Sequence, residues 1–177
     1  MPRPYYLDAS AITRWAEWRG GATDTRNSTV GEHVQRLIDD KDVRIATSEL
    51  SIAEFHSNIC GILNDQARKS HDEAWFDTTF RMLMRWIADG RLLVIKVPPK
   101  LAELAMVYAE RATREFGKRF KLRDAMHLYQ ACDWSRSLGE QVELISTDDD
   151  FEQFLKLFPE FGIHVVVVDP AKPPNGP

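Results

Sequence analysis

The chain has 177 residues, of which 44% are apolar and 28% charged, and its net charge is −4. This length suits one domain with a substantial core, and the composition is ordinary for a globular protein. No apolar run approaches the roughly 20 residues of a membrane helix, and the amino terminus has no hydrophobic signal region. Cys60 and Cys132 show no metal-ligand spacing and are expected to be reduced core residues. We therefore expect a cytoplasmic protein without a membrane partner.

Short apolar runs alternate with amphipathic stretches along the chain. The first run, at 4–8, predicts a buried strand, and Ser10 is expected to cap the helix that follows. The polar, glycine-containing stretch at 19–27 predicts a loop. Gly90 and Gly117 are expected to end helices. Further helices are predicted at 28–40, from 48 onwards with Ser48 as the expected cap, and at 72–88, 98–116, 122–138 and 149–157. Further strands are predicted at 43–47, 92–97, 142–146 and 164–168.

Short, continuously apolar strands that alternate with helices are typical of a parallel sheet covered on both faces. We expect such a domain over residues 1–169, followed by a disordered, proline-rich tail at 170–177. Ligands of these sheets bind beyond the carboxyl ends of the strands, near a topological switch point. Asp8 and Asp148 each come directly after a predicted strand, so the two residues should share that edge.

Four separated segments place acidic residues at the edge of a predicted strand or helix, namely Asp8, Glu54, Asp124 and Asp148. Carboxylates brought together from distant segments repel one another unless a cation neutralises them. Such a cluster is a candidate site for a divalent metal, and hence for chemistry at a phosphate.

Each acid also has a simpler explanation. Asp124 could stabilise the first turn of a helix, and the acid after the first strand could form a turn. The helical spacing leaves open whether Glu54 or Glu49 faces the site. The run of three aspartates likewise leaves open whether Asp148 or Asp150 does.

The stretches around these acids resemble the signature motifs of PIN-domain ribonucleases, and most closely those of VapC-type toxins from toxin–antitoxin pairs. The stretches are Leu-Asp-Ala-Ser at 7–10, Ala-Glu-Phe at 53–55, Asp-Ala-Met-His-Leu at 124–128 and Ser-Thr-Asp-Asp-Asp-Phe at 146–151. The resemblance runs from residue 5 to about residue 168. It implies a PIN-like three-layer α/β/α sandwich with a five-stranded parallel sheet, and a carboxylate pocket for Mg²⁺ or Mn²⁺.

The resemblance also implies residue roles. The catalytic places fall on Asp8, Glu54, Asp124 and Asp148. The metal ligands among them are expected to be Asp8, Asp124 and Asp148. Ser10 and Ser146 take the small hydroxyl places beside the first and last acids, and Asp150 is a rival ligand. The family more often has Thr where Ser146 stands.

The implied activity is that of a metal-dependent endoribonuclease, the toxin of a toxin–antitoxin pair. Its expected partners are an RNA substrate, a cognate antitoxin protein and a second copy of the chain in a homodimer. The polar stretch at 19–27 and the long helix after residue 72 make this chain larger than a compact toxin.

Basic residues crowd the stretch immediately before Asp124. We expect their side chains to contact RNA phosphates without reading the base sequence. A solvated helix end is the alternative explanation for such a charge run. The predicted RNA-binding residues are Lys118, Arg119, Lys121 and Arg123.

Two other functions stay open at this point. One is a PIN-like module that has lost catalysis and binds RNA or protein, but all four acidic places are filled, which disfavours it. The other is a phosphotransfer domain with Asp8 as nucleophile. A haloacid-dehalogenase-like site would need a second Asp where Ser10 stands, and the sequence has no Gly-rich phosphate loop. His127, one turn after Asp124, is expected to be packed or hydrogen-bonded rather than a ligand.

Overall fold

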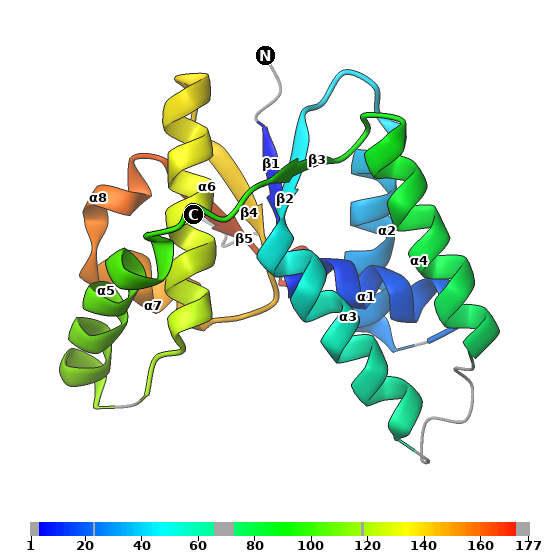
Figure 1. Cartoon of the computed structure of the whole chain (residues 1–177), viewed down its shortest axis with the longest axis horizontal. Helices are drawn as coiled ribbons and strands as arrows, with labels where there is room; N and C mark the ends of the chain where they lie inside the picture. Colours follow the sequence, from blue (N-terminus) through cyan, green and yellow to red (C-terminus); the bar gives the residue numbers. More distant parts are fainter. Residues whose placement is uncertain (1–3, 23, 66–72, 118, 173–177) are drawn as a thin grey trace.

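The computed structural model describes residues 4–22, 24–65, 73–117 and 119–172. Its strands form a five-stranded, all-parallel sheet in the order β3-β2-β1-β4-β5, with helices on both faces (Figure 1). The strands are β1 Tyr5–Leu7, β2 Ile45–Ser48, β3 Leu93–Ile95, β4 Val142–Ile145 and β5 Val165–Val168. The predicted three-layer α/β/α sandwich is therefore confirmed.

The helices divide between the two faces of the sheet (Figure 1). One layer contains α1 Ala9–Arg19, α2 Thr25–Asp39, α3 Glu49–Asn64 and α4 Glu73–Ala88. The other contains α5 Leu101–Phe116, α6 Leu122–Leu138, α7 Asp150–Leu157 and α8 Pro159–Gly162. The short helix α8 was not predicted from the sequence. The bounds of α6 match the prediction to the residue.

Each layer encloses a hydrophobic core of its own, because successive strand residues point to opposite faces. Tyr6 and Leu144 belong to the core under α5–α8, whereas Leu7 and Ile145 belong to the core under α1–α4. Burial on both faces explains why the strands are continuously apolar in the sequence. The two cores make the central strands a rigid support for whatever lies at their carboxyl ends.

The start of α1 differs from the prediction. Asp8, not Ser10, is the N-cap, and its Oδ1 accepts a hydrogen bond from the Ala11 N–H over 2.8 Å. Asp8 has the extended backbone conformation that an N-cap requires, so the helix begins directly after the strand. The predicted loop at 19–27 is also shorter, because Asp24 caps α2 by accepting from the Asn27 N–H over 2.9 Å.

The topological switch point lies between β1 and β4. From β1 the chain adds β2 and β3 on one side, and it then places β4 and β5 on the other side. Asp8 follows β1 and Ser146 follows β4, and the Ser146 hydroxyl donates to Asp8 Oδ2 over 2.6 Å. The prediction that the ends of these strands meet at one edge is confirmed.

Some predicted features fall outside the described residues, namely Lys118 and most of the tail, at 173–177. Residues 170–172 follow β5 as a turn, and Lys172 Nζ pairs with Asp149 Oδ1 at 2.6 Å. Within the described ranges, no helix is both long and apolar enough to cross a bilayer.

The close approach of α2 to α1 gives a prediction about stability. A Cβ at Gly31 would lie 2.5 Å from Cβ of Trp18, whereas a Cβ at Gly61 on α3 would meet nothing within 4 Å. Because the Cβ of Trp18 cannot move without its backbone, we expect Gly31→Ala to lower the free energy of unfolding by about 1–3 kcal/mol. The matched control, Gly61→Ala, should raise it by up to about 1 kcal/mol through helix propensity. Urea unfolding followed by circular dichroism measures both, and an unharmed Gly31→Ala variant would contradict the close contact.

Candidate active site

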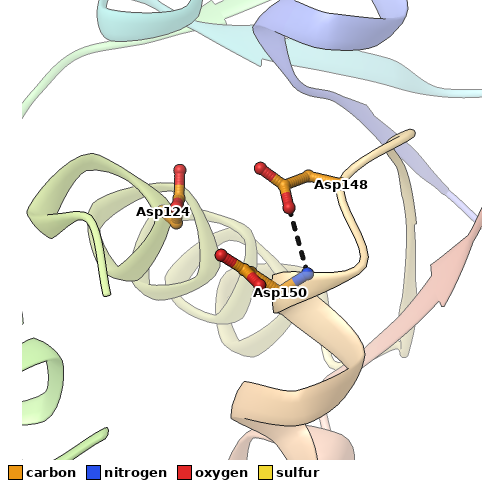
Figure 2. Close-up of side chains that lie close together, drawn as sticks. All are labelled: Asp124, Asp148 and Asp150. Carbon is orange, nitrogen blue, oxygen red and sulfur yellow. Dashed lines mark hydrogen bonds between the residues drawn. The ribbon is translucent and has the colours of Figure 1, made fainter. Parts of the chain in front are cut away.

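Three carboxylates converge at the carboxyl edge of the sheet. Asp124 lies in the first turn of α6, Asp148 in the loop after β4 and Asp150 at the start of α7, and Figure 2 shows them around a common space. One carboxylate oxygen from each lies within 4.8 Å of the other two. The Asp150 backbone N–H donates to Asp148 Oδ1 over 3.0 Å, which fixes the loop between these two acids.

Asp124 is the buried member of this acid cluster. Its side chain is 6% exposed, and among the described residues no group donates a hydrogen bond to Oδ2. Burial raises the pKa of Asp124 to about 6, with a further upward contribution from Asp148 and opposing ones from Lys121 and Arg123. A buried carboxylate oxygen without a partner costs free energy that a bound cation would recover.

The donor set suits a hard divalent cation. All three members of the acid cluster offer carboxylate oxygens, which are the ligands that Mg²⁺ and Mn²⁺ prefer. Asp148 and Asp150 are partly exposed, so the cluster can be reached from solvent. The open choice between these two aspartates is therefore not exclusive, since the structure brings both of them to the cluster.

Asp8, a predicted metal ligand, is not a member of this acid cluster, and its carboxylate is held by three donors. Its carboxylate accepts from the Ala11 N–H at 2.8 Å, from the Ser10 hydroxyl at 2.8 Å and from the Ser146 hydroxyl at 2.6 Å. Burial raises the pKa of Asp8 above its ordinary value, and these hydrogen bonds act in the opposite direction. Asp8 thus organises the edge of the sheet as a helix cap and as an acceptor from the β4 loop.

The two predicted supporting serines tie Asp8 to the loop that carries the other acids. Ser146 Oγ accepts from the Asp148 N–H over 3.1 Å while its own hydroxyl donates to Asp8. Ser10 Oγ accepts from the Thr147 N–H over 3.0 Å. Each hydroxyl therefore joins the end of β1 to the loop after β4 through one donated and one accepted hydrogen bond.

Glu54 lies on α3 and contacts residues of α6. Its Oε2 lies 3.1 Å from His127 Nε2, and its Oε1 lies 3.6 Å from Arg123 Nε. Glu49 instead accepts a hydrogen bond from the Val97 N–H over 3.1 Å. Of the two glutamates that the sequence left open, the structure therefore places Glu54 beside the first turns of α6. The prediction that His127 is hydrogen-bonded is confirmed.

Of the predicted basic residues, Arg119, Lys121 and Arg123 lie within the described ranges, near the end of α5 and the start of α6. A surface hollow of about 1180 Å³ there is lined by Arg119, Lys121, Arg123 and Arg114 together with apolar side chains such as Met106. The Nζ atom of Lys121 lies 3.5 Å from Asp148 Oδ2, so one residue that lines the hollow also contacts the acid cluster.

One supporting residue has no signal in the sequence. Arg26 on α2 donates to the Thr147 carbonyl over 2.6 Å and to Asp169 Oδ2 over 3.2 Å. Asp169 follows β5, so Arg26 connects α2 to the loop after β4 and to the end of β5. Nothing local marks Arg26 for this role, because both partners lie more than a hundred positions away.

Comparisons with known proteins support the fold. No protein-family model and no curated protein matches the sequence. The FitAB complex bound to the IR36 DNA fragment has a similar chain, with TM-score 0.59, 16% identity and coverage of 97% of this chain and 98% of that one. VapBC2 of Rickettsia felis, bound to a DNA fragment from its promoter, follows at TM-score 0.53 and 12% identity over 93% and 96% of the two chains.

A third similar structure is VapC20 of Mycobacterium tuberculosis, described as a toxin that cleaves the sarcin–ricin loop. It matches at TM-score 0.52 and 20% identity, over 84% of this chain and 92% of that one. The chain thus has, over nearly its whole length, the fold of the PIN-domain toxins of the VapC and FitB type. At these identities the likeness concerns the fold, and the chemistry has to be argued from the site.

The raised pKa of Asp124 predicts how stability depends on pH. In the folded protein the Asp124 carboxyl keeps its proton up to about pH 6. In the unfolded chain the same carboxyl releases that proton near pH 3.8. Without added metal, the free energy of unfolding should therefore fall as pH rises between those values. Asp124→Asn should abolish this part of the dependence, whereas the exposed Asp133→Asn on the same helix should keep it. Urea unfolding at several pH values tests this, and equal slopes for both variants would contradict it.

Proposed function

We propose that the chain is a Mg²⁺- or Mn²⁺-dependent endoribonuclease of VapC type that acts in the cytoplasm. Asp124, Asp148 and Asp150 would hold the cation, and Asp8 and Glu54 would complete the acidic site. One observation carries the proposal: three carboxylates lie within 4.8 Å of one another at the switch point of a PIN-like sheet. One of them, Asp124, has a buried oxygen with no partner among the described residues.

The reaction proposed is hydrolysis of a phosphodiester. The oxygen of water forms a bond to phosphorus while the bond to the leaving oxygen breaks, and a proton from water ends on that leaving oxygen. A bound divalent cation would stabilise charge at the phosphate and make water a better nucleophile. Glu54, whose carboxylate contacts His127 and Arg123, would orient the attacking water. Asp8 would keep Asp148 in position through Ser146.

The hollow between α5 and α6 would hold the RNA backbone. Its basic side chains gather positive charge locally on a chain whose net charge is −4, and local charge decides where a polyanion binds. Lys118, Arg119, Lys121 and Arg123 remain the proposed phosphate contacts. Apolar groups in the same hollow give unpaired bases a surface to pack against.

An antitoxin protein and a second copy of the chain are proposed as partners. The similar FitAB and VapBC2 structures are toxin–antitoxin complexes, which supports an antitoxin here. Exposed apolar side chains on α5, at Leu104, Met106 and Val107, supply a surface that a second copy would cover.

Removal of single acids tests the activity. Asp124→Asn and Asp148→Asn should each lower the rate of Mg²⁺- or Mn²⁺-dependent cleavage of total RNA by about 100-fold or more, because each removes charge from the cation site. Asp133→Asn is the matched control and should leave the rate unchanged. Mapping the cleaved ends separates specific cleavage from contamination.

Full activity in Asp124→Asn would refute the assignment. A chain that binds Mn²⁺ yet cleaves no RNA would instead favour the non-catalytic module that binds RNA or protein.

The basic hollow predicts a salt dependence. In Arg114→Ala with Arg119→Ala, the slope of log affinity against log salt for single-stranded RNA should shrink by about 0.7 for each phosphate that no longer meets an arginine. The matched control replaces Arg81 and Arg85, exposed on α4 in the other helical layer, and should keep the original slope. Filter binding at several salt concentrations measures both, and equal slopes would place the RNA elsewhere.

A further inference from the structure

A buried chain of hydrogen-bonding groups links the start of α3 to Glu54 through a residue of α6. Ser48 caps α3, as predicted, by accepting from the Ser51 N–H over 3.0 Å. Ser51 Oγ lies 3.3 Å from His127 Nδ1, and His127 Nε2 lies 3.1 Å from Glu54 Oε2. Ser48, Ser51 and His127 are at most 2% exposed. These contacts connect α3 of one helical layer to α6 of the other.

We propose that His127 is a positioning residue of the nuclease site, which holds the carboxylate of Glu54 in one orientation beside Asp124. This inference rests on the proposed function and adds to it a residue that acts through Glu54. Asp124 and His127 lie one helical turn apart on α6, so the same buried helix face carries a cluster acid and the residue that orients its neighbour.

The contact with Glu54 assigns one proton of His127. A carboxylate only accepts hydrogen bonds, so Nε2 must be the donor toward Glu54. On the other side of the ring, Ser51 Oγ lies 3.3 Å from Nδ1 and 3.1 Å from Ser48 Oγ. A hydroxyl can donate or accept, so Ser51 can serve as the partner of Nδ1 in either direction.

The surroundings of His127 keep its ring in place. His127 is 2% exposed, and the ring of Tyr6 meets the imidazole edge-on, with centroids 6.5 Å apart at 63°. At the other end of these contacts, the Glu54 side chain is 17% accessible, and its Oε1 lies 3.6 Å from Arg123 Nε. A glutamate there has three rotatable bonds, and a rigid donor removes most of that freedom before substrate binds.

Two amide replacements separate positioning from packing. In His127→Gln the amide N–H reaches about as far as Nε2 and can still donate to Glu54, whereas in His127→Asn the amide reaches only about as far as Nδ1. With a short RNA taken from a mapped cleavage site and Mn²⁺ present, His127→Asn should lower kcat about 10–100-fold with little change in KM. His127→Gln should recover most of that loss.

The dependence on Glu54 is tested by a double-mutant cycle. If His127 acts through Glu54, then His127→Asn should cost nothing further once Glu54→Gln is present. Losses that multiply independently, or a His127→Gln variant as impaired as His127→Asn, would overturn the positioning role. Asp124→Asn in the same assay tells the two proposals apart. Retained cleavage there refutes the nuclease itself, whereas lost cleavage with independent His127 and Glu54 effects refutes only this inference.

A readout without catalysis comes from nitrogen-15 NMR of histidine-labelled protein. The His127 signals, assigned by their loss in His127→Gln, should report a proton on Nε2 that is hydrogen-bonded to Glu54, and Glu54→Gln should shift that signal. An Nε2 without a proton in the unmodified protein would overturn the proposal, and this measurement on the unmodified protein stands even where a variant fails to fold.

Discussion

Repulsion among the carboxylates of Asp124, Asp148 and Asp150 is the constraint on which the arrangement of the site depends. The three lie within 4.8 Å of one another, and one of them is buried enough to raise its pKa to about 6. Such an arrangement persists only where hydrogen bonds from the surrounding structure fix the acids in place, or where positive charge is close. The chain does both: hydrogen bonds fix the loop that carries two of the acids, and Lys121 brings a cationic group to Asp148.

Support for the acids comes from both helical layers and meets at the switch point. Asp8 caps α1 and receives the Ser146 hydroxyl, so the end of β1 holds the loop after β4. Arg26 reaches that loop from α2, and His127 joins α6 to α3. Two separate hydrophobic cores keep these elements in fixed positions. The site is therefore as rigid as the packing of the sheet, which a preorganised hydrolytic centre requires.

The similarity to toxin structures concerns the fold, whereas the side chains of the site bear on the chemistry. At 16% identity and a TM-score of 0.59, the likeness to FitAB establishes a shared arrangement of strands and helices. Folds of this kind support many chemistries, and only the grouping of particular side chains distinguishes them. The acid cluster, its buried oxygen without a partner among the described residues, and the adjacent basic hollow are the features on which the proposed function rests. An exposed apolar face on α5 separately argues for a protein partner.

The sequence alone determined features that depend on neighbouring residues. The alternation of strands and helices, the Ser48 cap and the bounds of α6 follow from periodicity and from capping chemistry, which act over a few positions. The carboxyl edge with its acids follows from the rule for parallel sheets. Only the tertiary structure decided that Asp8 caps α1, that Asp150 joins the cluster and that Glu54 rather than Glu49 lies beside α6. Those outcomes depend on where a helix starts, since a shift of one residue turns a side chain by about 100°. Other contacts of the site, such as those of Arg26, join residues more than a hundred positions apart, which no local pattern reveals.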